Sequence, residues 1–309
     1  MSKVRILFLG TADFAVPALK AAFEDEHYEI VKVITQPDRP AGRKLEMKAS
    51  PVKLCAAELG LEVLTPEKIN QPEMLEEIAS YKADIAVVIA YGQILSQKFL
   101  DLFPFGAVNV HGSLLPRWRG AAPVQRAIMA GDSVSGVCLQ KVVKELDAGD
   151  VLGARRVEIS EEMTASELYE ILKERAAELI HIELMDYIRG NLSGAKQNPE
   201  EVTHAAKIGK QEGELDFCKT AEQIWNTYKA LSIWPGVWTF LNGKKVKLTK
   251  VKKAYAKGEP GDIIENDKQS FYIVCGKGAI EVLELQPESK AKMKVKDFLN
   301  GFSLPKKVG

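Results

Sequence analysis

The chain has 309 residues, of which 46% are hydrophobic. This length exceeds that of an ordinary single domain, so we expect one large and one small domain, each with enough apolar side chains for a core. No apolar run approaches the roughly 18 residues that cross a bilayer, and the first residues lack the pattern of a signal peptide. We therefore expect a cytoplasmic protein without a membrane partner.

The formal net charge is zero, but the two signs are unevenly distributed. Residues 1–207 hold 24 basic and 30 acidic side chains, which leaves 18 basic and 12 acidic in residues 208–309. The stretch 223–258 contains eight lysines, six aromatic residues and no acidic residue. Such a patch suits a polyanion, although an ordinary solvated lysine face has the same composition.

Apolar segments alternate with helical segments over the first 190 residues, which predicts a doubly wound, mostly parallel α/β sheet. Ser50 and Pro51 are residue types that open a helix, and 83–90 is the nearly unbroken apolar run of a central parallel strand. Ligands of such sheets bind outside the carboxyl ends of the strands. In chain order we expect strands over 4–9, 30–35, 62–64 and 83–90, with helices beginning near Val16 and spanning 51–59 and 72–81.

The remaining segments predict a different architecture. Thr164 and Glu167 have the spacing of a capping box, which opens a long helix that ends near Gly190. A helix over 220–231 and several short strands separated by tight turns then indicate a small all-β module. Strands are also expected over 134–143 and 150–159, on either side of an acidic turn. The expected domains are residues 1–190 and 208–309, joined by a polar linker over 191–207.

The most informative motif lies at the end of a predicted strand. Asn109, His111 and Ser113 share one face of that strand by its two-residue period. A side-chain amide can donate a hydrogen bond to an oxyanion, and an imidazole can carry a proton at neutral pH if a carboxylate such as Asp147 orients it. These groups suit acyl transfer. From the residues alone a structural role stays open, in which Asn109 and His111 satisfy backbone groups at the strand end.

Residues 109–125 read NVHGSLLPRWRGAAPVQ. This string closely resembles the signature of the formyltetrahydrofolate-dependent formyltransferases, especially the branch that acts on methionyl-tRNA. Blocks at 8–14, 35–43, 88–92 and 146–150 agree with the family in order and spacing, and the resemblance weakens after about residue 205. It implies a Rossmann-like formyltransferase domain followed by a small OB-like β-barrel.

The resemblance also implies roles for individual residues. Asn109, His111 and Asp147 match the positions that stabilise the oxyanion and move protons while the formyl group leaves N10 of 10-formyltetrahydrofolate. The expected folate contacts are Ser113, Leu114, Leu115 and Pro116, with Tyr91, at another strand end, as a further lining residue.

The expected acceptor is initiator methionyl-tRNA, formylated by a monomeric enzyme for translation initiation. In the family, the loop that matches residues 36–50 reaches the end of the tRNA acceptor arm. Ala12 stands where the family normally has proline, and Lys44 and Glu46 depart from its loop pattern. The candidate tRNA contacts are Arg39, Arg43, Lys44 and Lys48 in this loop, and Lys244, Lys245 and Lys247 in the C-terminal domain.

Two other functions fit part of the sequence. A formyltransferase for a small amine, such as a sugar nucleotide or glycinamide ribonucleotide, would not need a second basic domain. A catalytically silent folate- or RNA-binding module would not need Asn109, His111 and Asp147 together.

Other cofactors lack their usual motifs. No strand is followed by a glycine-rich phosphate loop, which argues against a nicotinamide or a nucleoside triphosphate. The four cysteines are widely scattered and none lies near a histidine, so neither a zinc site nor a disulfide framework is expected. We predict that the protein needs no metal.

Overall fold

The computed structural model describes residues 3–41 and 46–309, which form two compact units. The first unit comprises Met1–Pro123, Val134–Glu158 and Leu168–Ala205. The second comprises Val124–Ser133, Ile159–Glu167 and Ala206–Gly309. Two short segments that precede residue 168 thus pack with the C-terminal residues.

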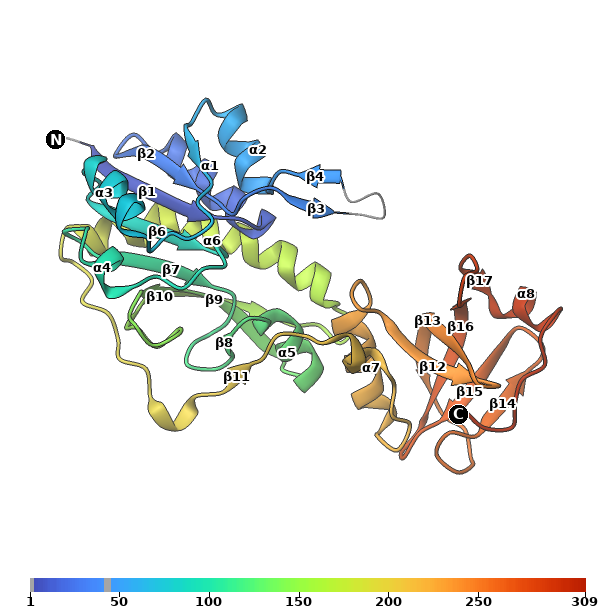
Figure 1. The fold of residues 1–309 in the computed structure, drawn as a ribbon. Helices are drawn as coiled ribbons and strands as arrows, with labels where there is room; N and C mark the ends of the chain where they lie inside the picture. The colour runs from blue at the N-terminus through green and yellow to red at the C-terminus, as the bar shows by residue number, and fades with distance from the viewer. Residues whose placement is uncertain (1–2, 42–45) are drawn as a thin grey trace. The chain divides into compact units, whose positions relative to one another are not determined.

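A mostly parallel seven-stranded sheet forms the centre of the first unit (Figure 1). Five strands run parallel, whereas β9 pairs antiparallel with both β7 and β10 at one edge. Every residue of β6 is buried, as a central parallel strand requires, and the predicted α/β class is confirmed. In sheet order the strands are β10 (Val151–Glu158), β9 (Val134–Lys141), β7 (Ala107–His111), β6 (Ile85–Ile89), β1 (Val4–Gly10), β2 (Tyr28–Ile34) and β5 (Val63–Leu64).

The helices predicted near Val16 and at 51–59, 72–81 and after Thr164 begin at the residues that the sequence indicates. Ser50 Oγ accepts a hydrogen bond from Lys53 N at 3.0 Å, and Thr164 Oγ1 accepts one from Glu167 N at 3.3 Å. Within the described ranges 3–41 and 46–309, no helix is both long and apolar enough to span a membrane. The helices before residue 206 are η1 (Asp13–Ala15), α1 (Val16–Glu24), α2 (Pro51–Glu58), α3 (Pro72–Ser80), α4 (Gln97–Leu100), α5 (Pro123–Ala130), α6 (Ala165–Ile188) and η2 (Pro199–Glu201).

The segment predicted as a basic loop contains a β-hairpin. Its strands, β3 (Arg39–Ala41) and β4 (Glu46–Lys48), pair antiparallel, with Arg39 opposite Lys48. The prediction of a loop was therefore incomplete, because three residues in β3 and three in β4 form regular antiparallel pairs.

Much of the polar segment after α6 carries ordered backbone contacts within the first unit. β11 (His204–Ala205) pairs parallel with β8 (Arg119–Gly120), and Ala195 forms an isolated bridge with Val151. These contacts bring Ala195 to the start of β10, and residues 204–205 to the chain that follows β7.

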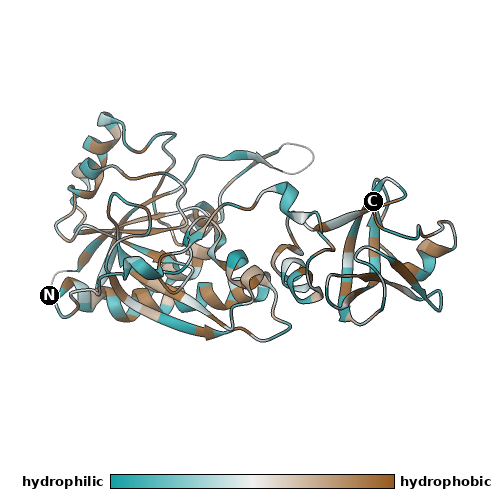
Figure 2. Cartoon of the chain, turned by 90° about the horizontal axis from the view of Figure 1, so that it is seen from below, coloured by the Kyte–Doolittle hydropathy of each residue, from teal (hydrophilic) through white to brown (hydrophobic). Residues whose placement is uncertain are grey.

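The second unit contains an antiparallel sheet, as the short strands predict. Its strand order is β12-β13-β16-β15-β14, with β17 added on β16. Buried and exposed residues alternate along parts of these strands, and hydrophobic and hydrophilic colours correspondingly change along them in Figure 2. The elements are η3 (Lys210–Gly213), α7 (Ala221–Leu231), β12 (Val237–Leu241), β13 (Lys244–Ala254), β14 (Ile263–Asn266), β15 (Ser270–Val274), β16 (Ala279–Pro287), β17 (Met293–Lys294) and α8 (Val295–Leu299).

Candidate active site

Strand β7 delivers two of the predicted catalytic side chains to the carboxyl end of the sheet. Asn109 and His111 are two residues apart, so they share a face of β7, and they pair with Gln140 and Cys138 of β9. Asn109 is half-buried, and its side chain makes no hydrogen bond to any described residue. Its amide is thus available to a ligand.

His111 is almost fully buried and has a neighbour at each ring nitrogen. Nε2 lies 2.8 Å from the carbonyl oxygen of Trp118, and Nδ1 lies 3.5 Å from Oδ2 of Asp147. A carbonyl oxygen only accepts hydrogen bonds, so Nε2 carries a hydrogen and donates it to Trp118. This fixes the ring orientation and leaves Nδ1 facing the carboxylate.

Asp147 is held from two sides. Oδ1 accepts a hydrogen bond from Gln140 Nε2 at 3.0 Å, and Oδ2 accepts one from Gly120 N at 2.9 Å. The residue itself has a left-handed backbone, with φ of 52°. Such a conformation is uncommon outside glycine and is tolerated by aspartate better than by most residues.

The acidic turn needs a glycine two residues later. A Cβ atom on Gly149 would lie 1.8 Å from the carbonyl oxygen of Lys141, well inside van der Waals contact. Only a residue without a side chain lets the turn approach the end of β9 this closely. The glycine of the Asp-Ala-Gly-Asp string at 147–150 is thereby explained by geometry.

The predicted folate-binding residues directly follow β7. Ser113 is fully buried and its Oγ donates to the carbonyl oxygen of Arg117 at 2.6 Å, so its hydroxyl is already engaged by the backbone. Leu114, Leu115 and Pro116 are half-buried, and the peptide bond between the last two is cis. These three residues present partly accessible apolar surface beside His111.

Tyr91 lies in the hydrophobic core of the first unit, with 2% of its surface exposed. Its carbonyl oxygen accepts hydrogen bonds from Thr11 Oγ1 and Gln36 Nε2, at 2.8 and 3.3 Å. The hydroxyl has no hydrogen-bond partner among the described residues, and burial raises the pKa of Tyr91. The backbone of this residue is therefore used structurally, and its ring packs against core residues.

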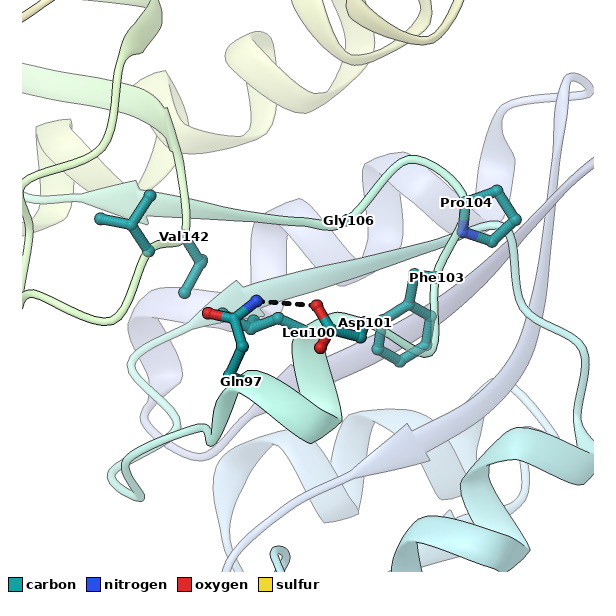
Figure 3. Close-up of a pocket in the computed structure, with 8 residues that line it drawn as sticks. Gln97, Leu100, Asp101, Phe103, Pro104, Gly106 and Val142 are labelled. Atoms are coloured by element: carbon teal, nitrogen blue, oxygen red, sulfur yellow. Dashed lines mark hydrogen bonds between the residues drawn. The ribbon is translucent and has the colours of Figure 1, made fainter.

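A pocket of about 470 Å³ opens between the start of β7 and the end of β9. Figure 3 shows Gln97 and Asp101 of the α4 region joined by a hydrogen bond at its side, 2.7 Å between Nε2 and Oδ1. None of the predicted catalytic or folate-binding residues lines this pocket. Its lining residues are Gln97, Leu100, Asp101, Phe103, Pro104, Gly106, Val142 and Val143.

The predicted tRNA contacts fall on two separate elements. In the hairpin, Lys48 is exposed, whereas Arg39 Nη2 donates to Glu67 Oε2 at 2.6 Å. Arg43 and Lys44 lie outside the described residues.

In β13, Lys244 and Lys247 are exposed. Lys245 Nζ stacks 3.5 Å from the centroid of the Trp238 ring. Because side chains alternate along a strand, Lys245 and Lys247 share one face and Lys244 points to the other.

Sequence reasoning missed two residues around the catalytic pair, Gln140 and Gln197, whereas Arg119, beside the folate motif, was expected to hold a phosphate or to pair with a carboxylate. Gln140 is 2% exposed, and Arg119 is 8% exposed with its guanidinium paired to Glu145 Oε1 at 3.0 Å. Gln197 bridges the acidic turn and Arg119. Gln140 could have been noticed as a lone polar residue in an apolar strand, but no local signal marks Gln197.

Known proteins share both the sequence pattern and the two-part organisation of this chain. Two models of the formyl transferase family match it, "Formyl transferase" over residues 3–183 and "Formyl transferase, C-terminal domain" over residues 207–303. The chain belongs to the formyl transferase family. The prediction that the chain belongs to this family is thus confirmed, and so is the prediction that it is an enzyme of formyl transfer.

Individual relatives agree with this membership. The methionyl-tRNA formyltransferase of Bdellovibrio bacteriovorus is 51% identical over 100% of this chain and 98% of its own length.

Solved structures show the same fold. A Helicobacter canadensis N-formyltransferase bound to folinic acid and dTDP-3-aminofucose has a TM-score of 0.68 and 19% identity, over 95% of this chain and 100% of that one. HypX of Aquifex aeolicus in complex with tetrahydrofolic acid has a TM-score of 0.61 and 21% identity, over 96% of this chain and 47% of that one.

The described residues hold no candidate metal centre. Across 3–41 and 46–309, no group of three or more histidine, cysteine, aspartate or glutamate side chains is arranged to hold a metal ion.

Proposed function

We propose that this enzyme transfers the formyl group of 10-formyltetrahydrofolate to the amino group of methionyl-initiator tRNA. The observation that carries the proposal is the 51% identity, over the full chain, to a methionyl-tRNA formyltransferase. The arrangement of Asn109, His111 and Asp147 supports it, because the reaction passes through a tetrahedral intermediate that needs an oxyanion donor and a proton carrier. The same proposal makes the enzyme a cytoplasmic monomer that serves translation initiation.

Asn109 stabilises the oxyanion in this mechanism. The amino group of the acceptor attacks the formyl carbon, and the carbonyl oxygen becomes negatively charged. The free side-chain amide of Asn109 donates a hydrogen bond to that oxygen as the charge develops. The absence of a competing hydrogen bond within the described chain keeps this donor available.

His111 and Asp147 move the proton. Nε2 is committed to the Trp118 carbonyl, so Nδ1 is the ring nitrogen that exchanges a proton. The attacking amine must lose a proton, and the leaving N10 must gain one. An imidazolium satisfies the carbonyl and the carboxylate together, with Nδ1 and Oδ2 of Asp147 3.5 Å apart. It gives the Nδ1 proton to N10 as the bond from N10 to the formyl carbon breaks, and the neutral imidazole then takes the proton that the attacking amine loses.

The folate binds beside this pair. Leu114, Leu115 and Pro116 supply apolar surface for its flat ring system, while Ser113 supports the turn through its bond to Arg117. The Aquifex aeolicus HypX, which shares this fold, is described in complex with tetrahydrofolic acid, and this supports a folate as the formyl donor. Tyr91 follows a neighbouring strand, but its ring is buried in the core, so its side chain is not part of this folate surface.

The basic C-terminal unit favours tRNA over a small amine acceptor. Lys245 and Lys247 on one face of β13, with Lys48 of the hairpin, offer positive charge that a phosphate backbone can use. Arg39, Arg43, Lys44 and Lys244 complete the proposed set. The Helicobacter canadensis enzyme of the same fold is described with dTDP-3-aminofucose, so the fold alone does not select the acceptor.

The test is a formylation assay with purified protein and 10-formyltetrahydrofolate. Charged initiator tRNA is compared with dTDP-amino sugars, glycinamide ribonucleotide and free methionine. We expect formylation of the tRNA alone. Turnover of a small amine with no reaction on tRNA would overturn the proposed acceptor, and no reaction on any of them would overturn the proposed activity.

A further inference from the structure

We propose that Gln197 is a positioning residue, which holds the Asp147 turn at the distance from His111 that proton transfer needs. The inference rests on the proposed function. Gln197 lies in the polar segment that follows α6, far from the signature motif in sequence, yet it contacts both sides of the acidic turn in space. Nothing in the local sequence around this residue points to the reaction.

The amide of Gln197 forms hydrogen bonds with the backbone of the turn. Its Nε2 donates to the carbonyl oxygens of Asp147, at 2.8 Å, and Gly149, at 2.7 Å. A primary amide has two hydrogens, and these two bonds are the short ones, since the same nitrogen lies 3.4 Å from Gln140 Oε1. The two bonds lie on either side of Ala148 in the chain, and one of them is to the backbone of Asp147, whose conformation is left-handed.

The carbonyl oxygen of Gln197 is fixed in turn by Arg119. Arg119 Nε donates to Gln197 Oε1 at 3.0 Å, and the arginine side chain is itself almost buried. In the sequence, Arg119 lies between Trp118 and Gly120, whose backbone groups contact His111 and Asp147. The Trp118 carbonyl accepts from His111, and Gly120 N donates to Asp147. Gln197 therefore joins the segment that orients the imidazole to the turn that carries the carboxylate.

Asp147 has further hydrogen bonds of its own, which act on its carboxylate and not on its backbone. Gln140 Nε2 and Gly120 N donate to the two carboxylate oxygens and orient the carboxylate. The position of the turn's backbone determines where the side chain of Asp147 begins. Gln197 donates two of the hydrogen bonds to that backbone. Misplacement of a reacting group by about 1 Å costs up to about a hundredfold in rate.

The first test replaces Gln197 in the full-length enzyme. Gln197→Met keeps the length of the side chain and removes the amide. We expect kcat for tRNA formylation to fall between about tenfold and a hundredfold, with the KM values of folate and tRNA changed less than about twofold, because the altered group acts on proton transfer and touches neither substrate. Gln71→Ala is the matched control, since that glutamine is exposed in the same unit and its side chain caps nothing. We expect the control to behave as the unchanged enzyme.

A double-mutant cycle separates positioning from general destabilisation. In an Asp147→Asn background, Gln197→Met should lower kcat by less than about twofold, because the group that Gln197 positions has already been removed. A residue that merely stabilises the fold would lower kcat by the same factor in both backgrounds. If Gln197→Met does not fold, Gln197→Glu takes its place, because it keeps an acceptor for Arg119 and lacks both N–H donors.

The two proposals fail in different ways. If the unchanged enzyme does not formylate tRNA, the proposed function is wrong. If it does, and the Gln197 variant has normal kcat or an additive effect with Asp147→Asn, the positioning role is wrong. A crystal structure of the variant gives a readout independent of activity. We expect the separation between His111 Nδ1 and Asp147 Oδ2 to increase from 3.5 Å, and an unchanged separation would overturn the inference.

Discussion

His111 shows how one side chain is prepared by contacts at both ring nitrogens. The Trp118 carbonyl fixes Nε2, and the Asp147 carboxylate faces Nδ1 in a nearly water-free setting, with side-chain exposures of 7% and 9%. In such surroundings a hydrogen bond or charge contact is stronger than in water. The orientation of the imidazole is thus set by neighbours that lie after β7 in the chain.

The first prediction concerns the three proposed catalytic residues. Asn109→Ala, His111→Ala and Asp147→Ala should each lower turnover by about a hundredfold or more, since each removes the oxyanion donor or part of the proton path. Single-turnover formylation rates measure the effect. Circular dichroism serves as the control for folding. A folded His111→Ala enzyme with near-normal turnover would contradict the mechanism.

The second prediction concerns the space around Leu114. A Cβ atom on Gly136 would lie 2.2 Å from the Arg155 carbonyl oxygen and 2.6 Å from Leu114 Cδ2. Gly136→Ala should therefore lower the free energy of unfolding by about 1 to 3 kcal/mol and raise the KM for folate, because Leu114 must move. Gly301→Ala is the control, since a Cβ there meets nothing within 4 Å. Equal urea midpoints for the two variants would disprove the packing argument.

At the scale of elements, strands and helices bring distant charges together. Asp25, just after α1, accepts hydrogen bonds from His27 N and His27 Nδ1, at 3.0 and 2.8 Å, and from His181 Nδ1 of α6 at 3.1 Å. Burial alone would raise the pKa of Asp25, but the hydrogen bonds and charge of His27 and the bond from His181 outweigh it and lower the pKa below 3.8. The charged carboxylate of Asp25 thus connects His27, directly before β2, with His181 of α6.

The third prediction follows from this lowered pKa. A carboxyl group whose pKa is lower in the folded chain stabilises the fold above its unfolded value of 3.8, and the contribution disappears as the pH falls through the folded-state pKa. Asp25→Asn should lower the free energy of unfolding by about 1 to 2 kcal/mol at pH 7. The difference from the unchanged enzyme should shrink as the pH falls below 3.8.

Urea unfolding across a pH series measures this effect. Glu26→Gln serves as the neighbouring control, because Glu26 is exposed and its carboxylate has no partner among the described residues. A deficit in Asp25→Asn that is constant down to about pH 2, well below the unfolded-state pKa, would show that the charge of Asp25 is not responsible.

The fourth prediction concerns strand β13. Replacing Lys244, Lys245 and Lys247 with alanine should weaken tRNA binding and reduce the slope of log affinity against log salt by up to about one unit for each lysine that neutralises a phosphate. Because Lys244 lies on the other face of the strand, its single replacement should have the smallest effect. Folate KM should not change. An unchanged slope in the triple variant would show that these lysines form an ordinary solvated face.

At the scale of the whole molecule, chain order and compact units do not coincide. The second unit includes segments 124–133 and 159–167, which precede the predicted linker. Arg126 pairs with Glu212, and Lys229 Nζ donates to the carbonyl oxygen of Glu161 at 2.6 Å. Burial lowers the pKa of Lys229, which marks this lysine as enclosed by the unit.

The fifth prediction follows from these contacts. A fragment of residues 1–207 keeps 124–133 and 159–167 but lacks the rest of their unit. We expect its Tm to fall by about 5 °C or more relative to the first transition of the full chain, with new binding of a hydrophobic dye. Differential scanning calorimetry measures the shift. If the fragment has the same Tm as the first transition of the full chain and binds no dye, the result would instead support domain boundaries at 190 and 208, as the sequence predicts.

Much of the architecture and part of the site could be predicted from local patterns. Apolar runs such as 85–89, the Ser50 cap and the Thr164–Glu167 capping box depend on neighbouring residues only, and the structure confirms each of them. The hairpin β3–β4 was not predicted, because three-residue strands rich in charge and proline carry no periodic signal.

The sequence by itself determined the α/β order, the family and the placement of Asn109 and His111 at a strand end. Only the tertiary structure decided what surrounds them. Gln197 meets Asp147 across 50 residues of chain and Arg119 across 78, and the pairing of β11 with β8 carries it there. Periodicity reports which face of an element is buried, whereas a hydrogen bond between distant segments depends on how the whole sheet and its connections fold.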